Sequence, residues 1–111
     1  MKIPYDSPKL DLILEALANQ RRRNILHLLA LNPSTVGFLG SETGLSLPAI
    51  HKHIRILETA ELIIRKKSGR TNYVIMNPKT LGLAQSWISQ YKTNWSSPTA
   101  SLTNYIARMQ Q

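Results

Sequence analysis

The sequence predicts a mainly α-helical fold with one small β-hairpin, and three observations support this prediction. With 111 residues, the chain has room for one domain with a modest core, so we expect a single domain over residues 1–111. Apolar residues recur at the 3.6-residue spacing of amphipathic helices along most of the chain. Between about residues 62 and 76, the spacing changes to the two-residue period of strands. The expected order is four helices, a hairpin, a fifth helix and a C-terminal helix.

The first expected helix covers about residues 7–18. Ser7 followed by Pro8 is a typical helix start, and apolar residues follow at positions i, i+3, i+4 and i+7. Further apolar residues widen this surface beyond one stripe, which is more than a helix packed on one side needs. We therefore expect a second contact, with another subunit. The residues expected at this contact are Leu10, Ile13, Leu14 and Leu17.

The second expected helix begins after Asn19, which can act as its N-cap, and opens with three arginines. Positive charges at a helix N-terminus oppose the helix dipole, so helix stability alone does not favour them there. Two interpretations stay open. The guanidinium groups could contact DNA phosphates, or their stems could cover the core while their heads are solvated or paired with nearby acids. The arginines are Arg21, Arg22 and Arg23.

The third and fourth expected helices form a helix-turn-helix. The third should end at about Thr43, where Gly44 supplies a left-handed C-cap and a tight turn. Ser46 can cap the fourth helix, expected over about residues 46–60, and Pro48 sits in its first turn, where a missing N–H donor costs nothing. Two short helices joined by a few residues with glycine are typical of this motif.

The fourth helix has one apolar side and one cationic side. Ile50, Ile54 and Leu57 form the apolar stripe, with His53 at its margin. A short, cationic outer side with several hydrogen-bond donors is typical of a helix that lies in the DNA major groove. The alternative is a surface helix whose basic side is merely solvated. The residues expected to face DNA are Ser46, Leu47, Pro48, His51, Lys52 and Arg55.

A β-hairpin is expected directly after this motif. Residues 62–67 and 71–76 are rich in β-branched and aromatic residues, and a glycine-containing turn separates them. A basic hairpin tip in this position, over about residues 65–72, is typical of a wing that reaches the DNA backbone or minor groove. The alternative is a hairpin kept soluble by edge lysines. The basic residues of the tip are Lys66, Lys67 and Arg70.

The C-terminal third is predicted to be helical and rich in aromatic residues. Both tryptophans and two of the four tyrosines lie there, and a Ser-Ser-Pro break at residues 96–98 divides it. This much apolar area at the end of a small domain favours an oligomer interface, with a ligand pocket as the alternative. We expect the terminal helices, about 7–18 and 79–110, to form the dimer contact. The later helices would contribute Trp87, Ile88, Tyr91, Trp95, Leu102 and Tyr105.

Composition points to a polyanionic partner. Lys and Arg number 14 against 6 Asp and Glu, which gives a formal net charge of +8. Double-stranded DNA fits better than double-stranded RNA, whose deep, narrow major groove a helix cannot enter. No segment approaches the roughly 20 apolar residues of a membrane span, and no apolar leader follows the first lysine. We therefore expect a cytoplasmic protein with no membrane partner.

The residue types argue against an enzyme. The chain has no cysteine, which excludes disulfides, thiolate metal sites and cysteine nucleophiles. Its three histidines and six acidic residues show no pairing suited to acid–base or nucleophilic chemistry. A winged helix used only for protein–protein interaction, without physiological DNA binding, is the alternative to a DNA-binding regulator, because a fold does not fix a function.

Three segments resemble the ArsR-type winged-helix transcription regulators. The run ALANQRRRNILHLL is similar to that family's Leu-Ala-x-x-x-Arg-x-x-Ile-Leu opening. The run GLSLPAIHKHIRIL is similar to its Gly-Leu-Ser-x-Pro-Ala-Val-Ser-x-His-Leu-x-x-Leu recognition element. The run GRTNY is similar to its Gly-Arg-x-x-Tyr wing. The resemblance extends from about Leu10 to Trp95, with the three segments in the family's order and spacing.

The resemblance implies a winged helix-turn-helix homodimer, built from the first and last helices, that binds a pseudo-palindromic operator and represses transcription. It also implies a structural role for His53. Metal sensors of the family use Cys-x-Cys sites on the first helix of the motif, or His and acidic residues on the last helix. Residues 34–41 have no thiol or imidazole, and residues 78–111 have no His, Asp or Glu. We therefore expect no metal and no cofactor, and the sequence leaves any small-molecule effector unknown.

Two further positions depart from the family pattern. His51 stands where the family usually has Ser, which changes an expected phosphate or base contact. Glu61 replaces the glycine that normally ends the recognition helix, so we expect a strained or reshaped junction there.

Overall fold

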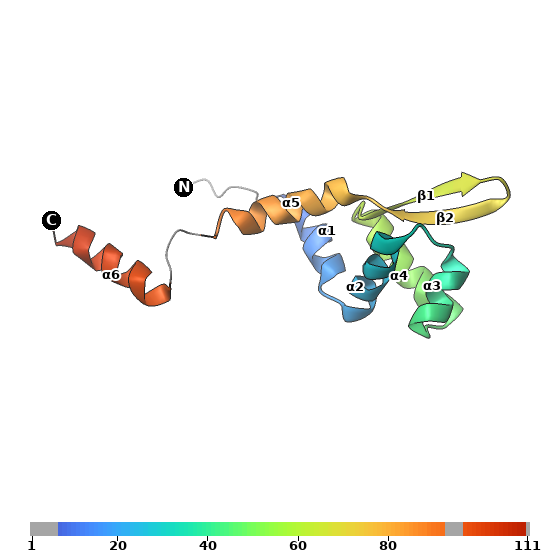
Figure 1. Ribbon diagram of the computed structural model, residues 1–111, viewed down its shortest axis with the longest axis horizontal. Helices are drawn as coiled ribbons and strands as arrows, with labels where there is room; N and C mark the ends of the chain where they lie inside the picture. The colour runs from blue at the N-terminus through green and yellow to red at the C-terminus, as the bar shows by residue number, and fades with distance from the viewer. Residues whose placement is uncertain (1–6, 93–96, 111) are drawn as a thin grey trace.

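The computed structural model describes residues 7–92 and 97–110, and it confirms the expected winged helix-turn-helix order of elements (Figure 1). Trp95, one of the expected interface residues, lies outside the described residues. The helices are α1 (Pro8–Leu17), α2 (Gln20–Leu31), α3 (Val36–Thr43), α4 (Leu47–Thr59), α5 (Pro78–Ser89) and α6 (Pro98–Met109). The strands are β1 (Ile63–Ser68) and β2 (Thr71–Met76).

Side-chain caps fix the starts of the first four helices. The Ser7 hydroxyl accepts a hydrogen bond from the backbone N–H of Leu10, and the Asn19 side chain accepts one from that of Arg21. Thr35 caps α3, and Ser46 caps α4 by accepting from the backbone N–H of Ala49 at 3.3 Å. Each such cap contributes about 1 kcal/mol to stability. The caps expected at Asn19 and Ser46 are confirmed, and the helix start expected at Ser7 and Pro8 is confirmed with Ser7 as its cap.

The five helices α1, α2, α3, α4 and α5 share one hydrophobic core with the base of the hairpin. Ile25, Leu39 and Ile54 are fully buried in it. Leu10 and Ile13, expected in a subunit contact, are 7% and 0% exposed within the chain itself. Their side chains therefore pack inside the protomer and are not available to a partner. The wide apolar surface of α1 is explained instead by contacts with α2, α4 and α5.

The hairpin is antiparallel, with a two-residue turn at Gly69 and Arg70 rather than the three-residue turn expected. Gly69 has φ of +61°, a conformation that favours glycine. The loop before α3 is also tied to the sheet. The backbone N–H of Val74 donates to the Ser34 carbonyl at 2.7 Å, and that of Ser34 donates back at 3.1 Å. Nothing in the local sequence indicated this bridge.

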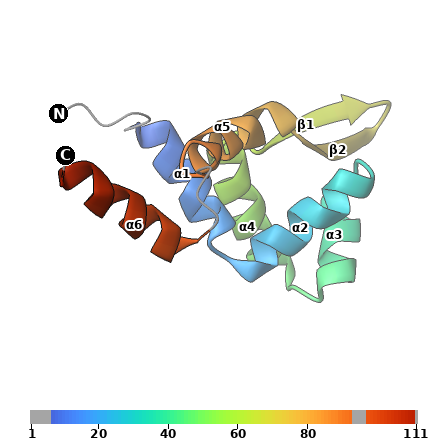
Figure 2. The same ribbon diagram turned by 60° about the vertical axis from the view of Figure 1, so that its left-hand side comes forward.

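The C-terminal helices are arranged differently from the expected pattern. Helix α5 crosses α1 and ends at Ser89, before Tyr91 (Figure 2). The rings of Trp87 and Tyr91 meet edge to face, with centroids 5.4 Å apart. Helix α6 stands apart from the winged-helix body and has no buried residue among those described.

Candidate DNA-binding interface

Helix α4 separates a buried side from a polar outer side. Ile50, Ile54 and Leu57 are at most 1% exposed, so they fix the helix on the core. The outer side is open, and Leu47, at its start, is 64% exposed. All the residues expected to face DNA from this helix are exposed, namely Ser46, Leu47, Pro48, His51, Lys52 and Arg55.

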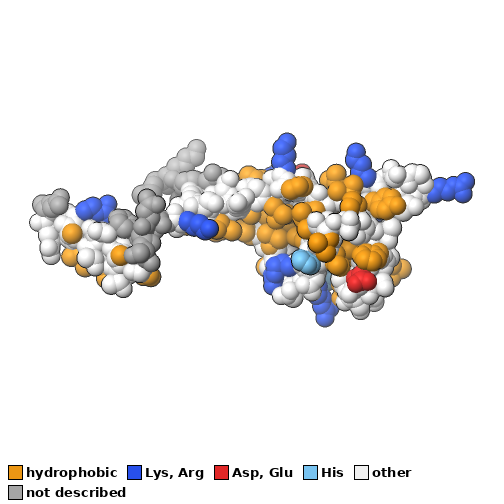
Figure 3. All heavy atoms as spheres, in the orientation of Figure 1, with side chains coloured by type: hydrophobic (Ala, Val, Ile, Leu, Met, Phe, Trp, Pro, Cys, Tyr) orange, Lys and Arg blue, Asp and Glu red, His pale blue; other side chains and the backbone are white. Residues whose placement is uncertain are grey.

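The hairpin, β1 and β2, projects away from the helical body (Figure 1). Its register pairs Lys66 with Tyr73 and Lys67 with Asn72, so the two lysines point to opposite faces of the hairpin. Lys66, Lys67 and Arg70 are all exposed. Basic side chains project from this end of the molecule in Figure 3. The tip can therefore present cations to either side of a phosphate backbone.

The cations of α4 and of the hairpin tip have no acidic partner among the described residues. The ion pairs found there join Lys9 to Glu61 at 3.0 Å and Arg65 to Glu58 at 3.1 Å. These pairs use acidic residues near the end of α4 and leave its outer side cationic. The basic residues of this surface without an acidic partner in the described part of the chain are Lys52, Arg55, Lys66, Lys67 and Arg70.

Arg22 has a structural role that neither open interpretation of the three arginines included. Its side chain is 9% exposed, and Nε donates to the Ala16 carbonyl at 2.7 Å while Nη2 donates to the Glu15 carbonyl at 3.1 Å. Its Nη1 lies 3.3 Å from Nδ1 of His53 on α4. Arg22 thus satisfies the Ala16 carbonyl, adds a second donor to the Glu15 carbonyl, which also accepts from the Ala18 N–H, and connects the end of α1 to α4.

The surroundings of His53 favour its neutral form at this contact. Burial lowers the pKa of His53 below 6.5, and the positive charge of Arg22 lowers the pKa further. A neutral imidazole can accept the hydrogen bond from the Arg22 guanidinium through Nδ1. The 9% exposure of His53 agrees with the structural role that the resemblance implies.

The two neighbouring arginines differ from Arg22. Arg23 Nη1 donates to the Leu17 carbonyl at 2.7 Å, and Nη2 donates to the Gln20 side chain at 3.0 Å. Arg21 is exposed, and its guanidinium makes no hydrogen bond within the described part of the chain. Of the three, Arg21 is therefore the one left open for phosphate contact. The need for donors at the end of α1 could have been read from the sequence, because α2 follows within three residues.

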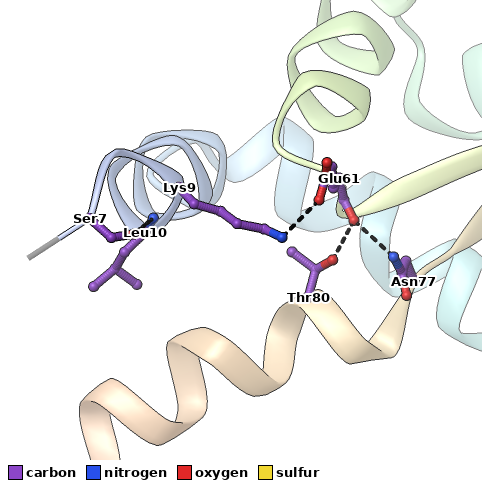
Figure 4. Close-up of polar contacts among 6 residues, drawn as sticks. All are labelled: Ser7, Lys9, Leu10, Glu61, Asn77 and Thr80. Carbon is purple, nitrogen blue, oxygen red and sulfur yellow. Dashed lines mark hydrogen bonds and ion pairs between the residues drawn. The ribbon is translucent and has the colours of Figure 1, made fainter. Parts of the chain in front are cut away.

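The junction after α4 is reshaped as expected. Glu61 has φ of +60°, the left-handed region that side chains other than glycine seldom adopt. Its carbonyl accepts hydrogen bonds from the Thr80 hydroxyl at 2.6 Å and the Asn77 amide at 3.3 Å, and its carboxylate pairs with Lys9 (Figure 4). This single residue therefore connects the end of α4 to α1 and to the start of α5.

Comparison with known proteins identifies the family. The model of the family described as "Bacterial regulatory protein, arsR family" matches residues 19–65, which hold α2, α3, α4 and the start of β1. The HTH-type transcriptional regulator Rv2034 of Mycobacterium tuberculosis is 32% identical over 101 residues, which cover 91% of this chain and 87% of that protein. The chain belongs to the ArsR family. The transcriptional repressor SdpR of Bacillus subtilis is 29% identical over 79 residues, 71% of this chain and 88% of that protein.

Solved structures agree with this assignment. A crystal structure of an ArsR family transcriptional regulator superposes with a TM-score of 0.71 at 30% identity, covering 80% of this chain and 98% of that one. The homodimeric winged helix-turn-helix DNA-binding domain Mb0332 of Mycobacterium bovis, solved in solution, gives a TM-score of 0.62 at 22% identity, covering 79% of this chain and 90% of that one. At that identity the second likeness shows the fold alone.

This ArsR-family protein is thus a DNA-binding transcriptional regulator and not an enzyme. The described residues contain no group of three or more His, Cys, Asp or Glu side chains able to hold a metal ion. Within the same residues, no helix has the length and apolar character needed to cross a bilayer.

Proposed function

We propose that this ArsR-family protein is a homodimeric repressor that binds a pseudo-palindromic operator, with α4 in the major groove and the hairpin on the backbone or minor groove. The observation that carries the proposal is the exposed outer side of α4, whose cations, like those of the hairpin tip, have no acidic partner among the described residues. A helix anchored by a fully buried apolar stripe presents those cations at a fixed orientation.

The two elements differ in the contacts they suit. Arg55 presents a planar guanidinium from a rigid helix, and such a group can donate two hydrogen bonds to O6 and N7 of guanine. Lys66, Lys67 and Arg70 project from a narrow hairpin and suit phosphate contacts, which position a protein without reading sequence. Leu47 and Pro48 are exposed at the helix start, and we assign them apolar contact with base edges.

The dimer contact is proposed for the outer surfaces of α1, α5 and α6. Because Leu10 and Ile13 are buried within the protomer, we omit them from the proposed contact and keep the partly exposed Leu14 and Leu17. The fold neighbour from Mycobacterium bovis is a homodimer, which supports this assembly. Large apolar side chains of α5, α6 and the turn after α5 are 49% to 57% exposed in the single chain, and a partner would cover them: Ile88, Tyr91, Leu102 and Tyr105. Trp87 is partly exposed beside them.

Repression is the mode of action proposed, and the Bacillus subtilis relative SdpR, itself a repressor, supports it. A dimer whose two α4 helices lie about one turn of the duplex apart, roughly 34 Å, would cover a contiguous stretch of promoter DNA. Blocking access of the transcription machinery requires no further activity from the chain.

Selection of bound duplexes from a random DNA pool, with the mass of the free protein measured by light scattering, tests the proposal. We expect a two-fold symmetric consensus sequence and a dimer, and reduced transcription when that sequence is placed in a promoter. A monomer, or a consensus without symmetry, would contradict the dimeric mode. Absence of any duplex retardation at low salt would instead favour a protein-interaction role for the fold.

A further inference from the structure

A hollow of about 300 Å³ lies where α2, α3 and β2 meet. Its apolar walls are Leu28 and Leu31 of α2, Pro33 of the following loop, Phe38 of α3 and Tyr73 of β2. Leu31 is 65% and Phe38 49% exposed, so the walls are open to solvent. Figure 3 shows hydrophobic side chains gathered on this face of the molecule. Single exposed apolar side chains are ordinary, but their convergence on one hollow is typical of a ligand site.

The hollow is uncharged, although the chain has a net charge of +8. Its polar lining consists of Asn32, Ser34 and Thr35. The Ser34 hydroxyl donates to the Asn32 carbonyl, and the Thr35 hydroxyl oxygen accepts from the backbone N–H of Phe38. Within the described residues, the side-chain amide of Asn32 and the hydroxyl of Tyr73 make no hydrogen bond. The lining therefore suits a neutral, mainly apolar molecule with one or two hydrogen-bonding groups.

The volume sets the size of the occupant. An apolar cavity of about 150 Å³ can hold one benzene molecule, so a hollow of about 300 Å³ suits a molecule of two fused rings. A buried protein side chain from a partner would fill less of this space than such a ligand, unless it were tryptophan.

We propose that this hollow binds a neutral, largely apolar small molecule of about two fused rings, and that its occupant alters DNA binding through the hairpin. The second part rests on the function proposed above. Tyr73, in the wall, pairs directly with Lys66 on the opposite strand. Its neighbour Val74 is bonded to Ser34 in the loop that lines the hollow. Phe38 precedes Leu39, which is fully buried in the core that also holds α4. An occupant therefore contacts the supports of both DNA-facing elements.

Indole, a neutral fused bicycle with one N–H donor, is the probe for the site. We expect its titration into the ¹⁵N-labelled full chain to shift the backbone amide signals of Leu31, Phe38 and Tyr73, with a dissociation constant below about 1 mM. Indole-3-acetate has the same rings and a carboxylate, and should bind at least about tenfold more weakly despite the positive net charge of the protein. Shifts elsewhere, no binding, or equal binding of the anion would overturn the site.

A matched pair of variants tests whether indole binds in this hollow. Phe38→Ala removes one wall and should weaken indole binding at least about fivefold, by loss of buried contact area. Ile64→Ala also shortens a partly exposed apolar side chain, 41% exposed, but one that does not line the hollow. It should leave indole binding unchanged. Equal effects of the two variants would contradict the location.

The coupling is tested separately with the selected operator. Saturating indole should change the affinity for that DNA at least about fivefold, the lower end of usual allosteric couplings, and Phe38→Ala should abolish the change. Indole that binds at the hollow without changing DNA affinity would overturn the regulatory part. A chain that binds indole there but binds no duplex would contradict the proposed DNA function and leave the ligand site supported.

Discussion

Arg22 shows how one buried side chain can orient a helix that it does not belong to. Its guanidinium satisfies two carbonyls at the end of α1 and contacts His53 on α4. A buried carbonyl without a donor costs more than an ordinary hydrogen bond gains, so the contacts matter mainly because their loss leaves polar groups unsatisfied. The proposed DNA-facing side of α4 therefore depends on a side chain of a different helix, α2.

Replacing Arg22 should destabilise the fold. Arg22→Ala leaves the Ala16 carbonyl without its donor, leaves the Glu15 carbonyl with the Ala18 N–H alone and removes buried packing. We expect the free energy of unfolding to fall by about 2–4 kcal/mol. Urea denaturation followed by circular dichroism measures this change. Arg21→Ala is the matched control, because Arg21 is exposed, and should change stability by no more than about 0.5 kcal/mol. Similar losses in both variants would refute the role of Arg22.

The lowered pKa of His53 predicts a pH-dependent stability. Well above pH 6.5, His53 is neutral in both the folded and the unfolded state, so it contributes no pH dependence there. As the pH falls below 6.5, the unfolded state binds a proton first, because burial and Arg22 disfavour the charged form in the folded state. The free energy of unfolding should therefore fall through this range until the lowered pKa is reached.

Denaturation from about pH 7.5 to about pH 5 in the wild type and in His53→Asn isolates this effect from the other histidines. The variant should lose stability less steeply below pH 6.5 than the wild type does. Parallel curves for the two proteins would contradict the assignment.

At the scale of elements, substitutions at Glu61 test whether the backbone is strained at the junction that follows α4. Its left-handed backbone favours glycine by about 1 kcal/mol, whereas its ion pair with Lys9 joins two side chains that are 53% and 62% exposed and adds little. Glu61→Ala loses the ion pair and keeps the strain, and Glu61→Gly loses both. We therefore expect Glu61→Gly to be more stable than Glu61→Ala by about 1 kcal/mol in thermal or urea unfolding. Equal stabilities of the two variants would show that the left-handed backbone at residue 61 is not strained.

The helix and the hairpin should respond differently to loss of charge. Arg55→Ala should cost about 1–3 kcal/mol on the selected operator and relax the preference at one base position, while changing random DNA less. Lys67→Ala should weaken binding to operator and random duplexes by the same factor, because a phosphate contact carries no sequence information. Fluorescence anisotropy on both duplexes measures the two ratios. Equal losses on both duplexes for Arg55→Ala would show that it contacts only the backbone.

The elements themselves were largely predictable, because caps, turns and apolar periods are local signals. The caps at Asn19 and Ser46 and the helix start at Ser7 and Pro8 lie where the sequence predicts them. Long-range contacts were not predictable in this way. The bridge between Ser34 and Val74 and the contact between Arg22 and His53 join residues 40 and 31 positions apart. The misassignment of Ile13 to a subunit contact has the same cause. Its helical spacing shows that its side chain is packed against apolar residues, but not whether they belong to the same chain or to a partner.

For the whole molecule, the net charge of +8 should appear as a steep dependence of DNA affinity on salt. If Lys52 and the three cations of the hairpin tip each neutralise one phosphate, the log–log slope is about −3.6 for one subunit and about −7 for a dimer on the full operator. Titrations on the full operator and on a half-site duplex, over a range of salt concentrations, measure both slopes.

The ratio of the two slopes carries the information, because it does not depend on the exact number of phosphates. A homodimer that places both subunits on the operator should double the slope relative to a half-site that only one subunit can occupy. Replacing Lys66 by Ala should reduce the full-operator slope by about 1.8, since each dimer loses two such contacts. An identical slope on both duplexes would show that a single subunit makes all the contacts, and would contradict the two-fold arrangement of the α4 helices.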